Sequence, residues 1–373
     1  MHAIRTVLMT ADSVGGVLTY AIELGRELTR REVRVALAVM GGPLSEPERA
    51  SVRAAGIALF EGDHRLEWME DPWEDVARAG RWLLDLEALV TPDVVHLGGL
   101  SHGALPFRAP RVVVAHSCVT SWFEAVERRP APAAFDRYRR EVRAGLAAAD
   151  AVVAPSRAMM SAIVRHHGAQ PRGRVILNGR DPARFRPSAK DGVVLSVGRA
   201  WDRGKNMAAL SAAAPSLPWP VRVAGSVIAP DGTRAPLAGL DHLGVLSEDD
   251  VAAHLARAAV YAAPARYEPF GLAIVEAALC RAALVLGDIP SLRELWDGAA
   301  LFVDPDDTGA LVGAIRALID DPRARATLAG CARSRALGYA SARMAEGYLG
   351  LYRELVGRSR RRPAESARAG ARS

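Results

Sequence analysis

The sequence predicts an α/β protein built from two doubly wound domains, and three observations support this. Short runs rich in Val, Ile, Leu and Ala alternate with segments of helical periodicity, which is typical of parallel sheets covered by helices on both faces. The 373 residues are too many for one ordinary domain and fit two, each large enough to bury its own core. Half of the residues are hydrophobic and 24% are charged, as in ordinary globular proteins.

The chain opens with a strand, a glycine-rich turn and a helix. Residues 4–9 form an apolar run, and a turn with Gly15 and Gly16 follows it, before apolar residues at helical spacing. This arrangement suits a phosphate, because small residues let the backbone approach a ligand and a helix N-terminus favours negative charge. Two adjacent glycines are not a G-x-G-x-x-G fingerprint, so a plain tight turn without a ligand is the alternative.

Further short strands fill the first half of the chain. Between them we expect a helix over 72–90, with Asp71 as its N-cap and Glu74 completing a capping box. His116 follows the strand 112–115, and a polar residue at the carboxyl end of a buried strand often points into a ligand cleft. A structural histidine bonded to neighbouring backbone is the alternative. The other expected strands are 34–40, 57–60, 94–97 and 151–154.

Two cations stand near the start of the second half. A linker containing Pro and charged residues, around 182–192, leads into an apolar strand at 193–197. Arg199 and Lys205 follow it across a strand-to-helix connection, so the two side chains can converge on one diphosphate. Exposed Arg and Lys are more often simply solvated, which is the alternative.

Two carboxylates mark the stretch 267–276, Tyr-Glu-Pro-Phe-Gly-Leu-Ala-Ile-Val-Glu. Glu268 and Glu276 come after the apolar run 259–263, so both lie just beyond the carboxyl end of a strand. Open α/β sheets bind their ligands at such a place. The alternative is an exposed loop glutamate followed by a solvated helix glutamate.

The same stretch predicts the start of a helix. Pro269 suits a first helical turn and Gly271 lets a ligand approach the backbone, so we expect the helix to begin near Phe270. The free N–H groups of Gly271 and Leu272 would then face an anion. A phosphate between two carboxylates that bind hydroxyl groups indicates a sugar nucleotide as the ligand.

The stretch resembles the Glu-x7-Glu signature of family 4 glycosyltransferases, which are retaining enzymes of the GT-B fold with nucleotide-sugar donors. The segment 178–185, Asn-Gly-Arg-Asp followed by Phe, resembles the hinge of that family. The resemblance covers nearly the whole chain and implies two Rossmann-like domains facing each other across a cleft. The implied parts are an acceptor-side domain at 1–185, a nucleotide-sugar-binding domain at 186–336 and a helix at 337–356 that packs back on the first domain.

The resemblance also implies roles for individual residues. Arg199 and Lys205 would clamp the donor diphosphate, and Glu276 would accept hydrogen bonds from the ribose. Glu268 would hold the donor sugar, and His116 would assist at the reacting face. The other implied contacts are Gly15, Gly16, Leu246, Phe270, Gly271 and Leu272 on the donor side, with His96 and His102 on the acceptor side.

The implied function is retaining transfer of a sugar from a nucleotide-diphosphate donor to an acceptor hydroxyl, in glycan, polysaccharide or glycolipid assembly. The acceptor could be a sugar, a lipid-linked molecule or a small molecule. No Asp-x-Asp pair stands at a cleft position, so we expect neither a metal ion nor a cofactor besides the donor. The alternatives are another GT-B enzyme, such as an epimerase or a phosphorylase, and a non-catalytic nucleotide-sugar-binding protein. A dinucleotide-dependent oxidoreductase would need the G-x-G-x-x-G fingerprint, which is absent.

Charge and cysteine usage complete the prediction. The formal net charge is +6, and residues 357–373 contain six arginines against one glutamate, so the basic character is confined to a tail that we expect to be disordered. We therefore expect no nucleic-acid partner; the tail either solubilises the protein or contacts an anionic membrane. Three cysteines without a CxxC pair suggest a reducing compartment. With no secretory signal and no apolar run of ~20 residues, we expect a cytoplasmic protein, peripheral to the inner face of the plasma membrane if the tail binds lipid.

Overall fold

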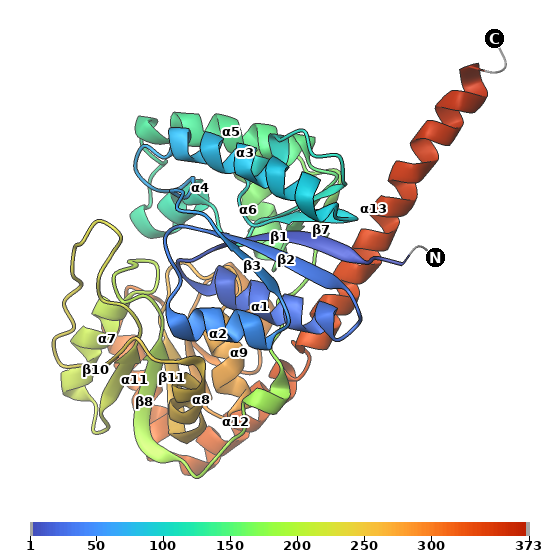
Figure 1. The fold of residues 1–373 in the computed structure, drawn as a ribbon. Coiled ribbons are helices and arrows are strands. Elements are labelled where there is room, and N and C mark those ends of the chain that lie inside the picture. The colour runs from blue at the N-terminus through green and yellow to red at the C-terminus, as the bar shows by residue number, and fades with distance from the viewer. Residues whose placement is uncertain (1–2, 371–373) are drawn as a thin grey trace.

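The computed structural model describes residues 3–370, which form two α/β domains stacked on one another (Figure 1). The first holds a seven-stranded parallel sheet with the strand order β3-β2-β1-β4-β5-β6-β7. The second holds a six-stranded parallel sheet with the order β10-β9-β8-β11-β12-β13. In both sheets the order reverses beside the first strand, as in doubly wound folds. The prediction of two doubly wound α/β domains is confirmed.

In the first domain the central strands are apolar and buried, whereas the edge strands β3 and β7 are partly exposed. Both faces of β1 are covered, so Val7 and Met9 pack toward α1 while Leu8, between them, packs toward α3 and α5. The strands are β1 (Thr6–Asp12), β2 (Arg34–Met40), β3 (Ala58–Glu61), β4 (Val94–Leu97), β5 (Arg111–Val114), β6 (Ala151–Ala154) and β7 (Gly173–Val175). The helices are α1 (Gly16–Thr29), α2 (Glu46–Ala54), α3 (Trp73–Val90), α4 (Val119–Trp122), α5 (Asp136–Ala148) and α6 (Arg157–His167), with a short 3-10 helix, η1, at Ser101–Ala104.

The second domain repeats this plan with a smaller sheet. Its strands are β8 (Asp191–Val197), β9 (Val221–Ala224), β10 (Asp241–Gly244), β11 (Ala258–Ala263), β12 (Ala283–Gly287) and β13 (Leu301–Val303). Its helices are α7 (Met207–Ala213), α8 (Glu248–Arg257), α9 (Leu272–Leu279), α10 (Pro290–Trp296), α11 (Thr308–Asp320) and α12 (Pro322–Ala336). Carboxyl ends of parallel strands meet at one edge of each sheet, so the loops after β8 and β11 are neighbours.

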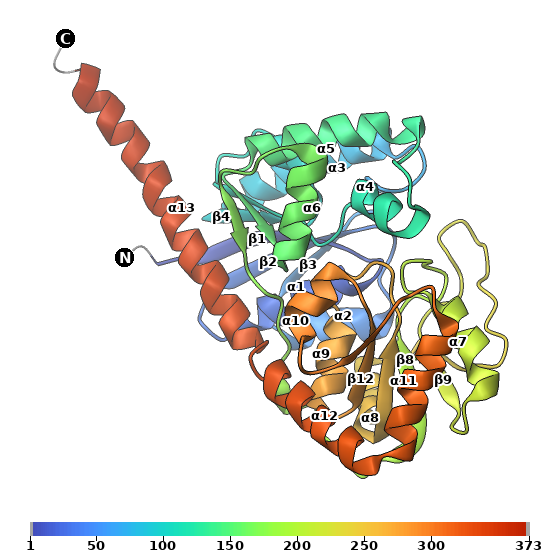
Figure 2. The ribbon, with the colours of Figure 1, turned by 180° about the vertical axis from the view of Figure 1, so that it is seen from behind.

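The last helix, α13 (Ser341–Gly370), returns from the second domain and runs along the first (Figure 2). Its apolar side chains, Met344, Tyr348, Leu351 and Leu355 among them, are buried in the same core as α1. The sequence predicted a disordered tail over residues 357–373. In the structure α13 instead continues as one helix to Gly370. Arg, Ala and Glu are good helix formers and favour this continuation, whereas Pro363 within the helix opposes it. Residues 371–373 lie outside the described part of the chain. No helix within residues 3–370 is long and apolar enough to cross a membrane.

The predicted capping box at the start of α3 is wrong. The helix α3 has Pro72 at its N-cap position and no capping side chain, because Asp71 adopts a left-handed conformation with φ of +39°. An N-cap residue needs extended backbone, which Asp71 at positive φ does not have. In the second domain Pro322 starts α12 directly after α11, and the Asp321 side chain caps it.

Candidate functional site

The loops at the carboxyl ends of β1 and β8 meet between the two domains. A Cβ atom built on Gly15 would lie 2.7 Å from Nη1 of Arg199, so the Gly15 backbone and the end of the Arg199 side chain lie close together, and the φ of +91° at Gly15 favours glycine. A Cβ atom on Gly16 would lie 3.9 Å from a methyl group of Leu272, at the start of α9. The structure thus brings together four residues that the sequence analysis proposed as donor contacts, from both halves of the chain.

The cation Lys205 and the carboxylate of Glu268 face each other in this region. Lys205 Nζ lies 2.6 Å from Glu268 Oε2, and both side chains are largely buried. Arg199 pairs with Asp202 at 2.9 Å, which leaves further guanidinium N–H groups on the side toward Gly15. A lysine ammonium has three N–H donors, so Lys205 can contact a diphosphate while it keeps Glu268. The two cations and one carboxylate fit a ligand with adjoining phosphate and hydroxyl groups.

The helix α9 begins beside this pair. Gly271 occupies the N-cap position with φ of +88° and no capping side chain, and Leu272 is the first helical residue. The helix therefore starts two residues after the expected Phe270, whose ring is buried against Tyr339 with centroids 5.6 Å apart. Leu246 is half-buried in the turn that leads from β10 to α8. N–H groups at the uncapped N-terminus of α9 suit an anion.

Glu276 lies one helical turn further into α9 and is buried. Its Oε1 is 2.8 Å from Nε of Arg180, a residue that the sequence analysis noted only as part of the hinge segment. Burial raises the pKa of Glu276, and the neighbouring Arg180 guanidinium opposes this shift. No local pattern could have revealed Arg180 as a site residue, because its partners lie far away in the sequence.

His116 stands at the end of β5, next to the cleft-facing loops. Its ring is half-buried and packs edge-on against Tyr20 with centroids 4.3 Å apart. Nε2 is buried and has no hydrogen-bond partner among the described residues. Burial lowers the pKa of His116 to about 3, so the imidazole is neutral at physiological pH. A neutral ring with an unpaired nitrogen is suited to a hydrogen bond with a ligand hydroxyl.

His96 and His102, the other two histidines that the resemblance implied as site residues, are buried in the first domain. His96 is fully buried, and its ring nitrogens contact the hydroxyl groups of Tyr20 at 3.2 Å and Tyr352 at 2.6 Å. The alternation of strand side chains turns His96 toward α1 and α13. His102 is also buried, and its Nε2 donates to the Val76 carbonyl at 3.2 Å. The described hydrogen bonds of His96 and His102 therefore go to Tyr20, Tyr352 and Val76, and not to Arg199, Lys205 or Glu268.

Asp12, at the carboxyl end of β1, is a candidate that the sequence analysis missed. Its Oδ2 accepts a hydrogen bond from Nε1 of Trp68 at 3.3 Å. Burial raises the pKa of Asp12 to about 7; the nearby Glu67 carboxylate adds to the shift, while the Trp68 bond and Arg199 oppose it. The position after a buried strand, which drew attention to His116, could have identified Asp12 too.

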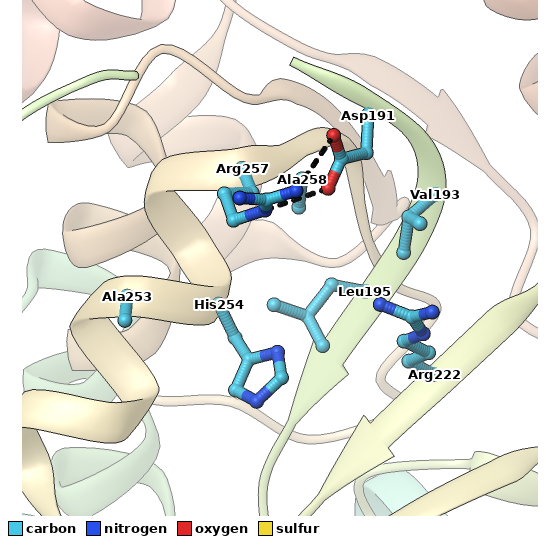
Figure 3. Close-up of a pocket in the computed structure, with 8 residues that line it drawn as sticks. All are labelled: Asp191, Val193, Leu195, Arg222, Ala253, His254, Arg257 and Ala258. Atoms are coloured by element: carbon cyan, nitrogen blue, oxygen red, sulfur yellow. Dashed lines mark hydrogen bonds and ion pairs between the residues drawn. The ribbon is translucent and has the colours of Figure 1, made fainter. Parts of the chain in front are cut away.

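A pocket on the second domain is lined by none of these residues (Figure 3). It has a volume of about 250 Å³ and lies between α8 and the strands β8 and β9. Arg257 pairs with Asp191 at 2.7 Å on its border. Asp191 is the first residue of β8, so the pocket lies toward the end of the sheet opposite to Arg199. Among the side chains that the structure describes, in residues 3–359, no three of His, Cys, Asp or Glu gather as metal ligands would.

Solved structures share this architecture over nearly the whole chain. The sucrose-phosphate synthase of Thermosynechococcus elongatus is 20% identical with a TM-score of 0.78, covering 95% of this chain and 99% of that one. The Anabaena protein HepE, solved in complex with UDP-glucose, is 18% identical with a TM-score of 0.75, covering 94% of this chain and 100% of its own. The two facing domains of this chain thus have the GT-B fold.

Family models identify the chain more closely. The model of Glycosyltransferase Family 4 matches residues 14–184, and that of Glycosyl transferases group 1 matches residues 191–321. The protein belongs to the family 4, group 1 glycosyltransferases, as the Glu-x7-Glu stretch predicted.

Curated relatives match over shorter segments. A glycogen synthase of Mycobacterium tuberculosis is 33% identical over 180 residues, which are 43% of this chain and 43% of the relative. A D-inositol 3-phosphate glycosyltransferase of Kineococcus radiotolerans is 35% identical over 118 residues, 29% of this chain and 27% of the relative. The matches thus span less than half the length of these relatives.

Proposed function

We propose that this glycosyltransferase moves a sugar from a nucleoside-diphosphate donor to an acceptor hydroxyl, with retention of the anomeric configuration and without a metal ion. The observation that carries the proposal is the Lys205–Glu268 pair, which adjoins the N-terminus of α9. A cation for a phosphate thus lies directly beside a carboxylate for sugar hydroxyls. Glycan, polysaccharide or glycolipid assembly is the proposed context, and Anabaena HepE makes UDP-sugars the first donors to test.

The proposed mechanism stabilises the leaving group. As the glycosidic bond breaks, negative charge grows on the diphosphate, and Arg199, Lys205 and the N-terminal N–H groups of α9 face it in a preorganised arrangement. Glu268 orients the sugar hydroxyls, and the neutral His116 ring hydrogen-bonds to the sugar or to the acceptor. The acceptor attacks on the face that the diphosphate leaves, and the leaving phosphate oxygen takes up the proton of the acceptor hydroxyl.

Calorimetry with UDP, GDP and ADP tests the donor site, with and without EDTA. We expect one nucleoside diphosphate to bind at least tenfold more tightly than the others, with a dissociation constant that EDTA does not change. NMR of the product formed from the matching nucleotide sugar should show the donor's anomeric configuration. Binding that requires a divalent cation would contradict metal independence, and an inverted product would contradict retention. If the protein releases free nucleotide or an altered sugar without any acceptor, an epimerase or another GT-B reaction is favoured. If it binds the nucleotide sugar but does not turn it over, a non-catalytic protein is favoured.

Asp12 is proposed to hold the acceptor hydroxyl, and its titration gives a second test. The folded protein keeps the carboxyl proton up to about pH 7, whereas the unfolded chain releases it near the ordinary pKa of 3.8. The contribution of this group to stability therefore falls as the pH rises between these values. We expect Asp12→Asn to gain thermal stability relative to the unchanged protein from pH 4 to pH 8, by about 3 °C or more. A difference in melting temperature that stays constant over this range would contradict the raised pKa.

The membrane contact of the basic segment 357–373 and the cytoplasmic location remain predictions. Co-sedimentation with vesicles of anionic and of zwitterionic lipids, at low and high salt, would test the first. Binding that requires anionic lipid and weakens with salt is the expected result.

A further inference from the structure

The hinge between the domains contains a buried guanidinium group that the proposed mechanism does not use. Arg180 lies in the segment that leads from β7 to β8, and it is 1% exposed. The backbone N–H of Arg180 donates to the Tyr339 carbonyl at 3.0 Å, and the backbone carbonyl of Arg180 accepts from the Ser341 N–H at 3.1 Å. Tyr339 and Ser341 belong to the segment between α12 and α13, where the chain returns to the first domain. Arg180 is therefore held where the two chain segments that connect the domains lie side by side.

Three carboxylates from three helices surround this guanidinium. Nη1 lies 2.7 Å from Oε2 of Glu23 in α1, and Nη2 pairs with Glu248 in α8. Nε of Arg180 lies 2.8 Å from Oε1 of Glu276 in α9. The two groups form an ion pair, but their geometry is not that of a hydrogen bond. The lone pairs of Glu276 thus stay available to other donors. The Arg180 side chain thus connects α1 of the first domain with Glu276, the proposed ribose contact.

Glu276 depends on Arg180 more than the other two carboxylates do. In the ion pairs of the described residues, Glu276 contacts Arg180 alone, whereas the other two each have a second cation. These second cations are Arg26 for Glu23, at 3.3 Å, and Arg184 for Glu248, at 2.8 Å. Removing Arg180 would leave Glu276 as a buried carboxylate without a cation, whereas Glu23 and Glu248 would each keep one.

We propose that Arg180 is the positioning residue of Glu276: it keeps this carboxylate charged and aimed at the donor ribose, and ties it to α1 of the first domain. The inference rests on the proposed function, since it requires Glu276 to bind ribose hydroxyls. A buried carboxyl without a cation takes up a proton and becomes a weaker hydrogen-bond acceptor. Loss of Arg180 should therefore act on ribose recognition and leave the diphosphate contacts of Arg199 and Lys205 in place.

The test compares the ribose and 2′-deoxyribose forms of UDP, GDP and ADP in calorimetry with the full-length protein. The unchanged protein should favour the ribose form of its preferred nucleotide by about tenfold or more, as expected for hydrogen bonds to a charged group. In Arg180→Met this preference should fall to below about threefold, as in Glu276→Gln. Arg180→Lys, which keeps a cation at the hinge, should restore part of it.

Arg184→Met is the matched control, because Arg184 shares Glu248 with Arg180 but does not contact Glu276. It should keep the full ribose preference. If Arg180→Met loses affinity equally for both sugar forms, or keeps the preference, the positioning role is wrong. If Arg180→Met does not fold, Arg180→Lys decides, and an unchanged ribose preference in that variant overturns the proposal. An unchanged protein without any ribose preference would instead contradict the ribose role of Glu276 in the proposed function.

Discussion

Replacing Lys205 with Ala should weaken binding of the preferred nucleoside diphosphate by about 10- to 100-fold. The ammonium group of Lys205 is 2.6 Å from Glu268 and is the cation next to the N-terminus of α9. A hydrogen bond to a charged group contributes about 1.5 to 3 kcal/mol, and each 1.4 kcal/mol changes an affinity tenfold. The variant also leaves the Glu268 carboxylate without its cation, next to the diphosphate. Isothermal calorimetry with the unchanged protein as reference measures the loss.

Arg203→Ala is the control for this prediction, because it removes a cation two positions away. The Arg203 side chain is 68% exposed and pairs with Glu127, so its removal should change the affinity by less than about threefold. Lys205→Arg keeps the charge but not the compact ammonium, and it should fall between Lys205→Ala and the unchanged protein. Equal affinities of Lys205→Ala and the unchanged protein would show that the diphosphate does not bind at this pair.

The lysines show what the sequence could and could not say about the site. Only two of the 48 Lys and Arg residues are lysines, and the strand-to-helix position of Lys205, together with the family resemblance, predicted it as a diphosphate contact. Lys190, the other one, donates to the backbone carbonyls of Ala256 at 2.8 Å and Cys280 at 2.6 Å, at the ends of α8 and α9. Burial lowers the pKa of Lys190 to about 8. A sequence motif thus distinguished a candidate ligand-binding lysine from a structural one.

Strands were the most predictable part of the fold. The segments 34–40, 94–97 and 151–154 have the predicted bounds, since a strand buried on both faces is a continuous apolar run between polar residues. Helix ends were less predictable: a capping box is present at Ser45 and Glu48 of α2, where none was predicted. Caps depend on the backbone conformation of one or two residues, which composition does not determine.

Side-chain partners at long range could not be predicted. His96 lies in a strand whose bounds were correct, yet its ring contacts Tyr352, which is 256 positions away. Arg180 and Asp12 likewise gain their partners only when the two sheets form and α13 returns to the first domain. Spacing within a motif predicts which residues share one loop or one helix face, whereas such contacts depend on the topology of the whole chain.

Gly225→Ala should lower both the stability and the nucleotide affinity of the protein, although Gly225 is not itself a proposed ligand contact. Gly225 follows β9 with φ of +135°, and a Cβ atom there would lie 2.0 Å from the carbonyl oxygen of Gly198. No real Cβ tolerates this distance, so Gly198 must move, and Arg199 is the next residue. We expect a loss of nucleoside-diphosphate affinity of more than tenfold together with a lower melting temperature. Calorimetry and thermal unfolding of the same preparation measure both effects.

Gly232→Ala separates the steric clash from the cost of the backbone conformation. Gly232 lies in the loop after β9 with φ of +83°, but a Cβ atom on it would meet no atom within 4 Å. Its replacement should therefore cost only about 1 to 2 kcal/mol of stability, from the left-handed conformation, and leave the affinity unchanged. If both variants lose stability equally and both bind the nucleotide normally, Gly198 can move without displacing Arg199. The close packing of the β8 and β9 loops would then not be required for the diphosphate site.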